Sequence, residues 1–215
     1  MLKVALLLLA SVFASAQSCT MATAPKPTGP LIRFDFSFPV SHPPEYHIAI
    51  AADGAATFDE PARDDQDAYH SDFQVAPEKA KWLFDTAHSL NDFSGDFEFR
   101  KHKVAETGEK RLTLLSGDKQ NTTTYHFSDN AQLQQLTAWL QGIALTQEFA
   151  RRAKLNLRFD KLALDADVKQ FTSDVQGGRA SELQSIRPLL QQLVDDPAVL
   201  NSARQRLKQL LSTTQ

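Results

Sequence analysis

The hydrophobic pattern of the chain changes once, near residue 129, and this change is what most constrains the fold. Before it, short runs alternate apolar and polar side chains with a period of two, which is typical of strands with one buried face. After it, apolar side chains recur every three to four positions, as in helices with one buried stripe. Strands and helices are thus segregated, which argues against a parallel, doubly wound sheet. We expect an α+β fold: an antiparallel meander sheet with a packed helix, followed by a C-terminal helical extension.

The strand-like block begins with the clearest strand in the sequence. In the run 31–38, four large apolar side chains alternate with polar ones and fall on one face: Ile32, Phe34, Phe36 and Phe38. Further strands are expected at 46–51, 55–58, 110–115 and 122–127, with a short one at 73–75 and a turn leading into another at 93–99. Asp53-Gly54 predicts a hairpin between two of these strands, because both residues tolerate positive φ.

Helices are expected on both sides of the change in pattern. Pro77 suits the first turn of a helix, and Asp129 or Asn130 can cap the first helix of the second block. That helix is either one long helix, whose buried stripe moves around its axis, or two helices with a break near 155–157. The later landmarks are a stop at Gly177-Gly178, a helix from Ser181 that contains Pro188, and a last helix capped by Asp196-Pro197.

The first sixteen residues have the composition of an export signal. Lys3 is their only charge, residues 4–14 are apolar, and Ala14-Ser15-Ala16 has the small–x–small pattern that a signal peptidase cleaves. The apolar run is shorter than the roughly 20 residues that span a bilayer, and no later segment of that length lacks charges. We expect a signal peptide at 1–16 and a periplasmic or secreted protein without a transmembrane segment after cleavage.

The rest of the chain divides into three expected parts. Residues 17–30 are rich in Thr, Ala and Pro and have too few bulky apolar side chains to offset the entropy of folding. This segment is therefore expected to be a flexible tether. Residues 31–150 are expected to form the α+β domain, and residues 151–215 the helical extension.

The single cysteine, Cys19, lies in the expected tether. One cysteine excludes an intramolecular disulfide and any multi-thiolate zinc or iron–sulfur site. Its position soon after the signal also fits a bacterial lipoprotein, in which such a cysteine is lipidated and anchors the protein. The alternative is cleavage near Ala16, which leaves Cys19 as an unpaired thiol in the tether.

The overall charge argues against one class of partner. The chain has 23 basic and 26 acidic residues, so its formal net charge is -3. A nucleic-acid-binding protein needs a basic surface to displace the counterions of the phosphates. We therefore expect no nucleic-acid partner.

The six histidines are the candidate ligands of a metal site. No two of them form a His-x-His pair, an i,i+4 pair on a helix or a His-Glu-x-x-His run, although His47 and His126, on expected strands, could meet across the sheet. His70 is the best candidate ligand, with Asp67 or Asp72 as its partner. It lies in an expected acidic loop, 59–72, whose Asp65 and Asp67 begin like a calcium loop but lack the glycine and closing glutamate that follow. A solvated loop is the preferred interpretation.

The motifs of nucleophilic and phosphate chemistry are missing from the sequence. There is no Gly-x-Ser-x-Gly elbow and no glycine-rich phosphate loop, and Cys19 has no neighbouring histidine. We therefore expect no cofactor and no catalytic residue. The preferred hypothesis is an exported bacterial envelope protein that binds a partner through its sheet or its tail without catalysing a reaction.

Three points stay open at this stage. The apolar stripe Leu200, Leu207 and Leu211 either binds a partner or packs inside the protein. The alternative function is a periplasmic hydrolase or metal-dependent enzyme that uses scattered residues: His47, His70 or His126 with acids of the 59–72 loop. A structural homodimer is the third hypothesis.

One short pattern resembles a known family. Pro44-x-Tyr46-x-Ile48-x-Ile50, with Asp53-Gly54 and then the helix around Trp82, is similar to a secreted bacterial domain family of unknown function. That family is marked by a Pro-x-Tyr strand, an Asp-Gly hairpin and a following helix, and the resemblance covers about residues 31–150. It implies an exported domain and no particular activity.

Overall fold

The computed structural model describes residues 29–64 and 66–213 of the chain. The expected signal peptide at 1–16, Cys19, and the tether up to residue 28 lie outside the described residues. Within the described part, no helix is both long enough and apolar enough to cross a bilayer.

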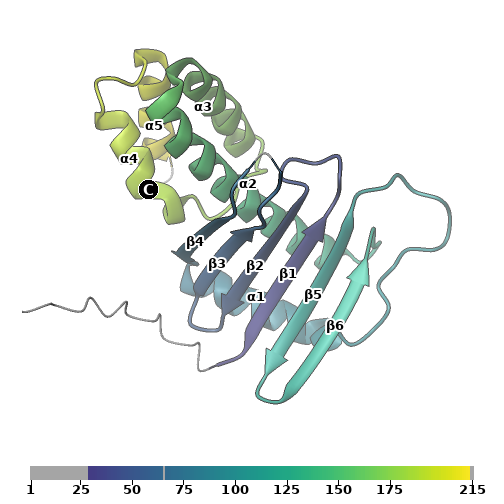
Figure 1. Cartoon of the computed structure of the whole chain (residues 1–215). Helices are drawn as coiled ribbons and strands as arrows, with labels where there is room; N and C mark the ends of the chain where they lie inside the picture. The colour runs from purple at the N-terminus through teal and green to yellow at the C-terminus, as the bar shows by residue number, and fades with distance from the viewer. Residues whose placement is uncertain (1–28, 65, 214–215) are drawn as a thin grey trace, which may run out of the picture.

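Six antiparallel strands form a single sheet (Figure 1). The strands are β1 (Leu31–Ser37), β2 (Glu45–Ala51), β3 (Ala55–Glu60), β4 (Tyr69–Gln74), β5 (Glu109–Ser116) and β6 (Lys119–Tyr125). Their spatial order is β4-β3-β2-β1-β5-β6, so β1 to β4 follow one another as a meander and the β5–β6 hairpin joins the far side of β1. The expected α+β fold with an antiparallel meander sheet is confirmed.

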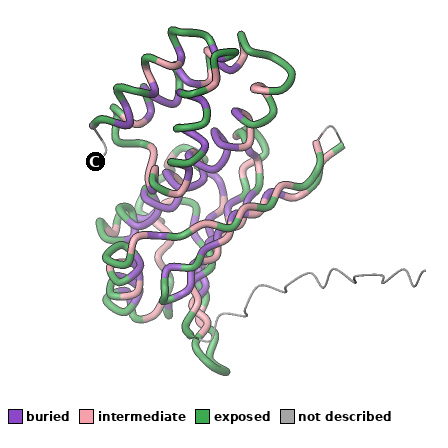
Figure 2. The backbone as a smooth tube through the Cα atoms, turned by 90° about the vertical axis from the view of Figure 1, so that its left-hand side faces the viewer, coloured by how far each residue is buried: buried purple, intermediate pink, exposed green. Residues whose placement is uncertain are grey.

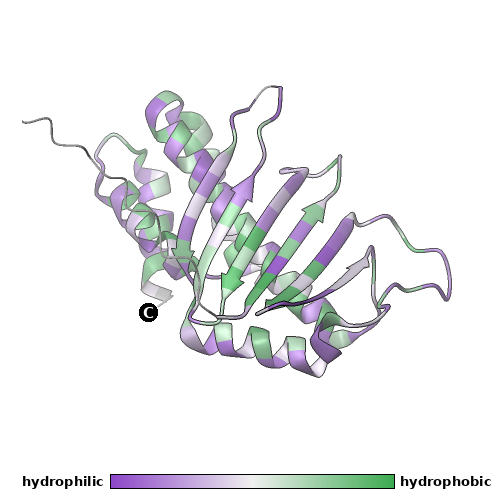
Figure 3. Cartoon of the chain, turned by 60° about the horizontal axis from the view of Figure 1, so that its bottom comes forward, coloured by the Kyte–Doolittle hydropathy of each residue, from purple (hydrophilic) through white to green (hydrophobic). Residues whose placement is uncertain are grey.

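Five α-helices and two short 3-10 helices complete the fold. They are α1 (Pro77–Ser89), η1 (Asn91–Phe93), α2 (Ala131–Phe159), α3 (Lys161–Gln176), η2 (Leu183–Ile186), α4 (Arg187–Asp195) and α5 (Asn201–Thr213). Helix α1 and the first half of α2 pack on one face of the sheet, and α3, α4 and α5 gather around the second half of α2 beyond the sheet edge (Figure 1). No helix of the described chain covers the opposite face of the sheet (Figure 3).

The main core lies between the sheet and its two helices. The alternating residues of the first strand, Ile32, Phe34 and Phe36, are buried as expected, and α1 and α2 contribute Leu83 and Leu136 from the other side. Buried residues accordingly follow the strands and α2 in Figure 2. Burial of this apolar surface is what holds the sheet and the two helices together.

A second core holds the helical part together. Phe149 of α2 stacks on Phe171 of α3 with ring centroids 3.9 Å apart, and leucines of α4 and α5 close around them. Leu207 and Leu211 are buried in this core, whereas Leu200 is 39% exposed. Two members of the apolar stripe therefore pack inside the protein. Helix α2 contributes to both cores, so the expected division at 150/151 falls inside one continuous helix.

Several helix ends differ from the expectation. Helix α2 continues through 155–157 to Phe159, because the break is made by Asp160, whose carboxylate accepts hydrogen bonds from the first amides of α3. The helix expected from Ser181 begins as α4 at Arg187, with Pro188 in its first turn. Amides of the first turn have no acceptor within the helix, so a proline there removes no hydrogen bond. The last helix begins at Asn201 rather than directly after Asp196-Pro197.

Two expectations about the sheet were wrong. The acidic segment is not one loop over 59–72, because β3 runs to Glu60 and β4 starts at Tyr69. The turn and strand expected at 93–99 are replaced by the end of η1 and an irregular segment. In this segment the Glu98 side chain, rather than a strand carbonyl, accepts the hydrogen bond from the backbone amide of His126. The amide of Phe99 donates to the carbonyl of Phe127, 2.8 Å away.

Candidate functional site

The uncovered side of the sheet carries a group of interacting polar side chains that no helix of the described chain covers. We call it the open face, and it consists of the residues that alternate with the buried ones along all six strands. Its charged and titratable members are Arg33, Asp35, Glu45, His47, Asp59, His70, Asp72, Glu109 and Arg111.

Strand register lines up five of these residues in one row across the sheet. Asp35 is paired with His47, His47 with Asp59, and Asp59 with His70. On its other side Asp35 is paired with Arg111. Directly paired residues have side chains about 5 Å apart, so acids and bases alternate along the row at contact distance. The opposite charges stabilise the pairing because no two like charges are direct neighbours.

Asp35 and His47 form the more protected contact of the row. Nδ1 of His47 lies 2.7 Å from Oδ1 of Asp35, and the guanidinium Nε of Arg33 donates to the same oxygen at 2.7 Å. Nε2 of His47 lies 3.6 Å from a carboxylate oxygen of Glu45. The Asp35 side chain is 17% exposed and that of His47 31%, so the contact is partly shielded from water.

Asp59 and His70 repeat this arrangement nearer the β4 edge. Nδ1 of His70 lies 2.6 Å from Oδ1 of Asp59, and its Nε2 lies 3.2 Å from Oδ1 of Asp72. Each of the two histidines is therefore held between two carboxylates. The pair is more open than the first, since the side chains of His70 and Asp59 are 55% and 46% exposed.

The carboxylates shift the protonation of both rings in the same direction. The hydrogen bond to Asp35 raises the pKa of His47 above 6.5, outweighing the opposing effect of burial. The hydrogen bond to Asp59 likewise raises the pKa of His70. Burial works to raise the pKa of Asp35, but the hydrogen bonds from His47 and Arg33 outweigh it and lower that pKa. The geometry therefore favours ion pairs in both places.

The open face carries an excess of negative charge, which is smallest when both of its histidines are protonated. It carries five carboxylates against the two arginines Arg33 and Arg111. Both arginines already contact acids of their own strands, Asp35 and Glu109. The excess negative charge therefore lies over β2 to β4, around His47 and His70, and it falls as these rings take up protons.

The structure places the expected metal ligands only partly together. His70 contacts Asp72, but Asp67 is an exposed residue of the loop between β3 and β4. Among the described residues, no group of three or more His, Cys, Asp or Glu side chains is arranged to hold a metal ion. Asp65, the first residue of the calcium-like pattern, lies outside the described residues.

The expected meeting of His47 with His126 does not occur. Strands β1 and β5 lie between β2 and β6, which separates the two positions by about 14 Å at the usual strand spacing. His126 instead contacts Glu98, with its Nδ1 3.4 Å from the carboxylate. The His47, His70 and His126 rings each contact carboxylates. These rings can exchange protons and form ion pairs.

Sequence reasoning missed Asp35, which anchors the row. A signal for it exists, because a polar residue in the middle of an apolar-alternating strand must point to the uncovered side. Its partner, however, depends on the register between β1 and β2, which are joined by a proline-containing loop of seven residues, 38–44. Loop length does not fix that register, whereas the tight hairpin at Asp53-Gly54 fixes the pairing of His47 with Asp59.

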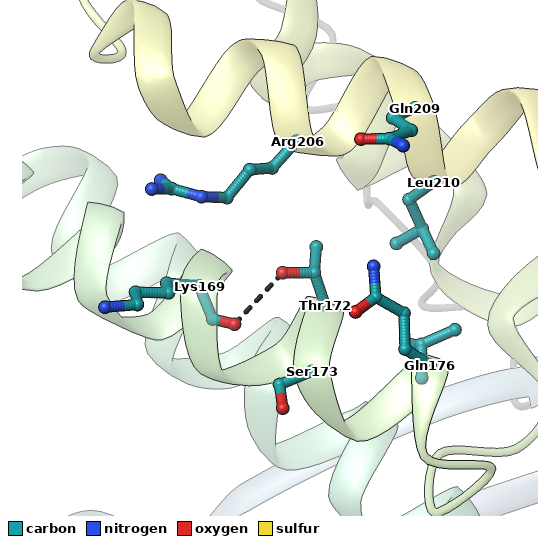
Figure 4. A pocket seen from close by; sticks show the side chains of 8 residues that line it. Lys169, Thr172, Ser173, Gln176, Arg206, Gln209 and Leu210 are labelled. Atoms are coloured by element: carbon teal, nitrogen blue, oxygen red, sulfur yellow. Dashed lines mark hydrogen bonds between the residues drawn. The ribbon is translucent and has the colours of Figure 1, made fainter.

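A groove between α3 and α5 has a volume of about 600 Å³ (Figure 4). It is lined by Lys169, Thr172, Ser173, Val175, Gln176, Arg206, Gln209 and Leu210. Two of its polar side chains already have partners within the protein: the Thr172 hydroxyl donates to the Val168 and Lys169 carbonyls, and Arg206 lies 2.9 Å from Asp165.

Comparison of the chain with models of known protein families and with curated proteins finds no match.

Proposed function

We propose that the chain is an exported bacterial envelope protein that acts as a non-enzymatic binding module, and that the open face is its recognition surface. The observation that carries the proposal is the row of alternating acids and bases from His70 to Arg111, on a face that no helix of the described chain covers. The strand register holds these groups in place before a partner arrives, so little side-chain entropy is lost on binding.

The charge of the face points to the chemistry of the partner. Excess carboxylates over β2 to β4 attract a partner surface with lysines or arginines, which gains complementary ion pairs. A second copy that presented the same face would bring Glu45, Asp59 and Asp72 against like charges. The proposal therefore commits to a different protein with a basic surface, and the homodimer is an outcome of the test.

The sequence supports the envelope location. The signal at 1–16 directs export, and the mature protein is then periplasmic or secreted. Lipidation of Cys19 is the alternative, and it would hold the same module at a membrane.

Affinity capture with charge variants tests the proposal. The tagged mature chain is used to capture partners from envelope extracts, beside the double variant Asp59→Asn and Asp72→Asn. The control is Asp85→Asn, which removes an equally exposed acid that pairs with Lys81 on α1, in the other layer. We expect a basic protein that the wild type and the control retain and the double variant loses by about tenfold, as two missing ion pairs predict. Equal capture by all three proteins, or light scattering that shows a dimer broken by the double variant, contradicts the proposal.

The alternative function keeps one supporting observation. A histidine bound to an aspartate, as in Asp35–His47 and Asp59–His70, is also the general-base half of a hydrolase site. A periplasmic hydrolase or metal-dependent enzyme would need a nucleophile or metal beside these rings. Metal analysis of the purified protein decides this: a bound ion lost in the His70→Gln variant supports the alternative, and an ion-free protein argues against it.

A further inference from the structure

The turn between α2 and α3 exposes the most prominent apolar side chains of the helical part. We call residues 154–162 the α2–α3 tip. Phe159 and Leu162 are 72% and 76% exposed, and Leu155 is 50% exposed. Leu155 and Phe159 are four residues apart and therefore lie one turn apart on the same stripe of α2. Side chains of this size are normally buried, so three exposed ones within eight residues indicate a contact surface.

The tip projects away from the sheet. Helix α2 still contacts the sheet at Arg151, whose Nε lies 3.3 Å from the Glu60 carboxylate, and at Lys154, whose ammonium lies 5.9 Å from the centre of the Tyr69 ring. Phe159 lies eight residues beyond Arg151, which places it about 12 Å further along the helix axis at 1.5 Å per residue. The side chains at the end of such an arm can reach a surface that the sheet does not touch (Figure 1).

Basic side chains flank the apolar cluster. Lys154, Arg158 and Lys161 lie within the tip, and the Arg158 guanidinium sits 5.4 Å from the centre of the Phe159 ring. The tip contains one acid, Asp160, whose carboxylate is occupied in capping α3. The nearby acids Asp165 and Asp167 contact Arg206 and Arg152 outside the tip. The tip is thus locally basic in a chain with a net charge of -3.

We propose that the α2–α3 tip docks onto an anionic phospholipid surface. Phe159, Leu162 and Leu155 enter the boundary between headgroups and acyl chains, while Arg158 and Lys161 reach the lipid phosphates with their long side chains. This arrangement is complementary to anionic lipid in both polarity and charge. The inference does not depend on the function proposed for the open face, because the two surfaces share no residue.

The geometry favours a lipid surface over the other occupants. The apolar side chains stand on a turn between two helix ends, and a fluid bilayer accepts such a projection without a matching groove. A second copy docking tip to tip would place Arg158 and Lys161 against the same two cations of its partner. A protein groove remains an outcome that the experiment distinguishes.

Vesicle co-sedimentation of the mature chain tests the inference. Binding is measured to vesicles of phosphatidylcholine alone and of phosphatidylcholine with phosphatidylglycerol. We expect binding only when the anionic lipid is present, and a decline as salt is added. The double variant Phe159→Ser and Leu162→Ser should lose at least about tenfold in the partition coefficient. The variant with Arg158→Gln and Lys161→Gln should lose roughly thirtyfold on anionic vesicles, at about 1 kcal/mol per cation.

Two controls make the result decisive. Val40→Ser replaces an equally exposed apolar residue, 75% exposed, in the loop between β1 and β2, and it should bind as the wild type does. Circular dichroism of each variant checks that it is folded, which is expected because the substituted positions are exposed.

Equal vesicle binding by wild type and tip variants, or none by the wild type, overturns the inference. Dimerisation that the tip variants abolish, seen by light scattering, overturns it in favour of a second copy.

Discussion

At the scale of single residues, the Asp35–His47 pair makes stability depend on pH. The pKa of His47 is raised above its unfolded value of 6.5, so its contribution to stability is complete below about 6.5 and is lost as the pH rises through the raised folded value. The pKa of Asp35 is lowered from 3.8, so its contribution is present above that value and is lost as the pH falls through the lowered one. The pair therefore stabilises the fold between these limits. Arg33 and Glu45 face the same ring and act in opposite directions on it.

We predict that His47→Gln lowers the free energy of unfolding by about 1 kcal/mol near pH 5, the size of a partly exposed charge-assisted hydrogen bond. The loss should shrink as the pH rises above 6.5, because the wild-type ring then gives up its proton. Urea denaturation over a series of pH values measures it. The control is His102→Gln, whose ring contacts Phe99 rather than a carboxylate. A loss that stays constant across the series would show that the ion pair is not its cause.

The buried Lys110 shows what a sequence cannot indicate at this scale. It occupies an inward position of β5, where a lysine is normally excluded, and is 5% exposed. Its Nζ donates to the carbonyls of Thr107, Gly108 and His126 at 2.7–2.8 Å. Burial lowers its pKa to about 8. These acceptors come from two chain segments that only the folded sheet brings together, so neither composition nor periodicity locates them.

At the scale of elements, local chemistry predicted more than spacing did. The Asp53-Gly54 hairpin, the proline start of α1 and the Asn130 cap of α2 each depend on residues next to one another, and all three are confirmed. The break at Asp160 was not located because the apolar pattern of α2 continues past it into α3. Residues 93–99 were misjudged for a similar reason, since Phe97 and Phe99 alternate with polar residues as in a strand, but hydrogen bonds between side chains and backbone hold this segment instead.

Gly54 allows a sharp prediction about the hairpin. It has φ +85°, and a Cβ there would lie 2.7 Å from the carbonyl oxygen of Val75, which belongs to the backbone and cannot easily move. Gly178 has φ +67° and open space around it. We predict that Gly178→Ala costs about 1 kcal/mol through backbone strain alone, and that Gly54→Ala costs about 1–3 kcal/mol more through the clash. Denaturant midpoints of the two variants give the comparison. Equal losses would mean that the turn relaxes freely around the added methyl group.

At the scale of the whole molecule, α2 joins the two cores. Its first half carries Leu136 against the sheet and its second half carries Phe149 against α3. A second link runs from Trp139 of α2, whose indole donates to the buried Glu182 at the start of the α4 region, 3.2 Å away. Neither core can lose α2 without exposing its own apolar face to water. We therefore expect the described chain to behave as one cooperative unit.

This cooperativity predicts a single unfolding transition. Trp82 and Trp139 report on the sheet core by fluorescence, and far-ultraviolet circular dichroism reports mainly on the helices. The two signals should change together on heating. Leu136→Ala and Phe171→Ala, one in each core, should each destabilise by about 2–5 kcal/mol and lower the same midpoint. Two separate transitions, with each variant moving only one, would show that the halves unfold independently.

The shared helix also limits how a chain of this kind can change over evolutionary time. Genetic recombination within codons 131–159 divides a helix that contributes buried side chains to both cores. Each recombinant protein then lacks part of the core packing. The sheet cannot be recombined with a different helical part unless the new part brings its own version of α2. The sheet and the helical part must therefore evolve together. A change in how far the α2–α3 tip extends requires a longer or shorter α2, and the sheet depends on that same helix.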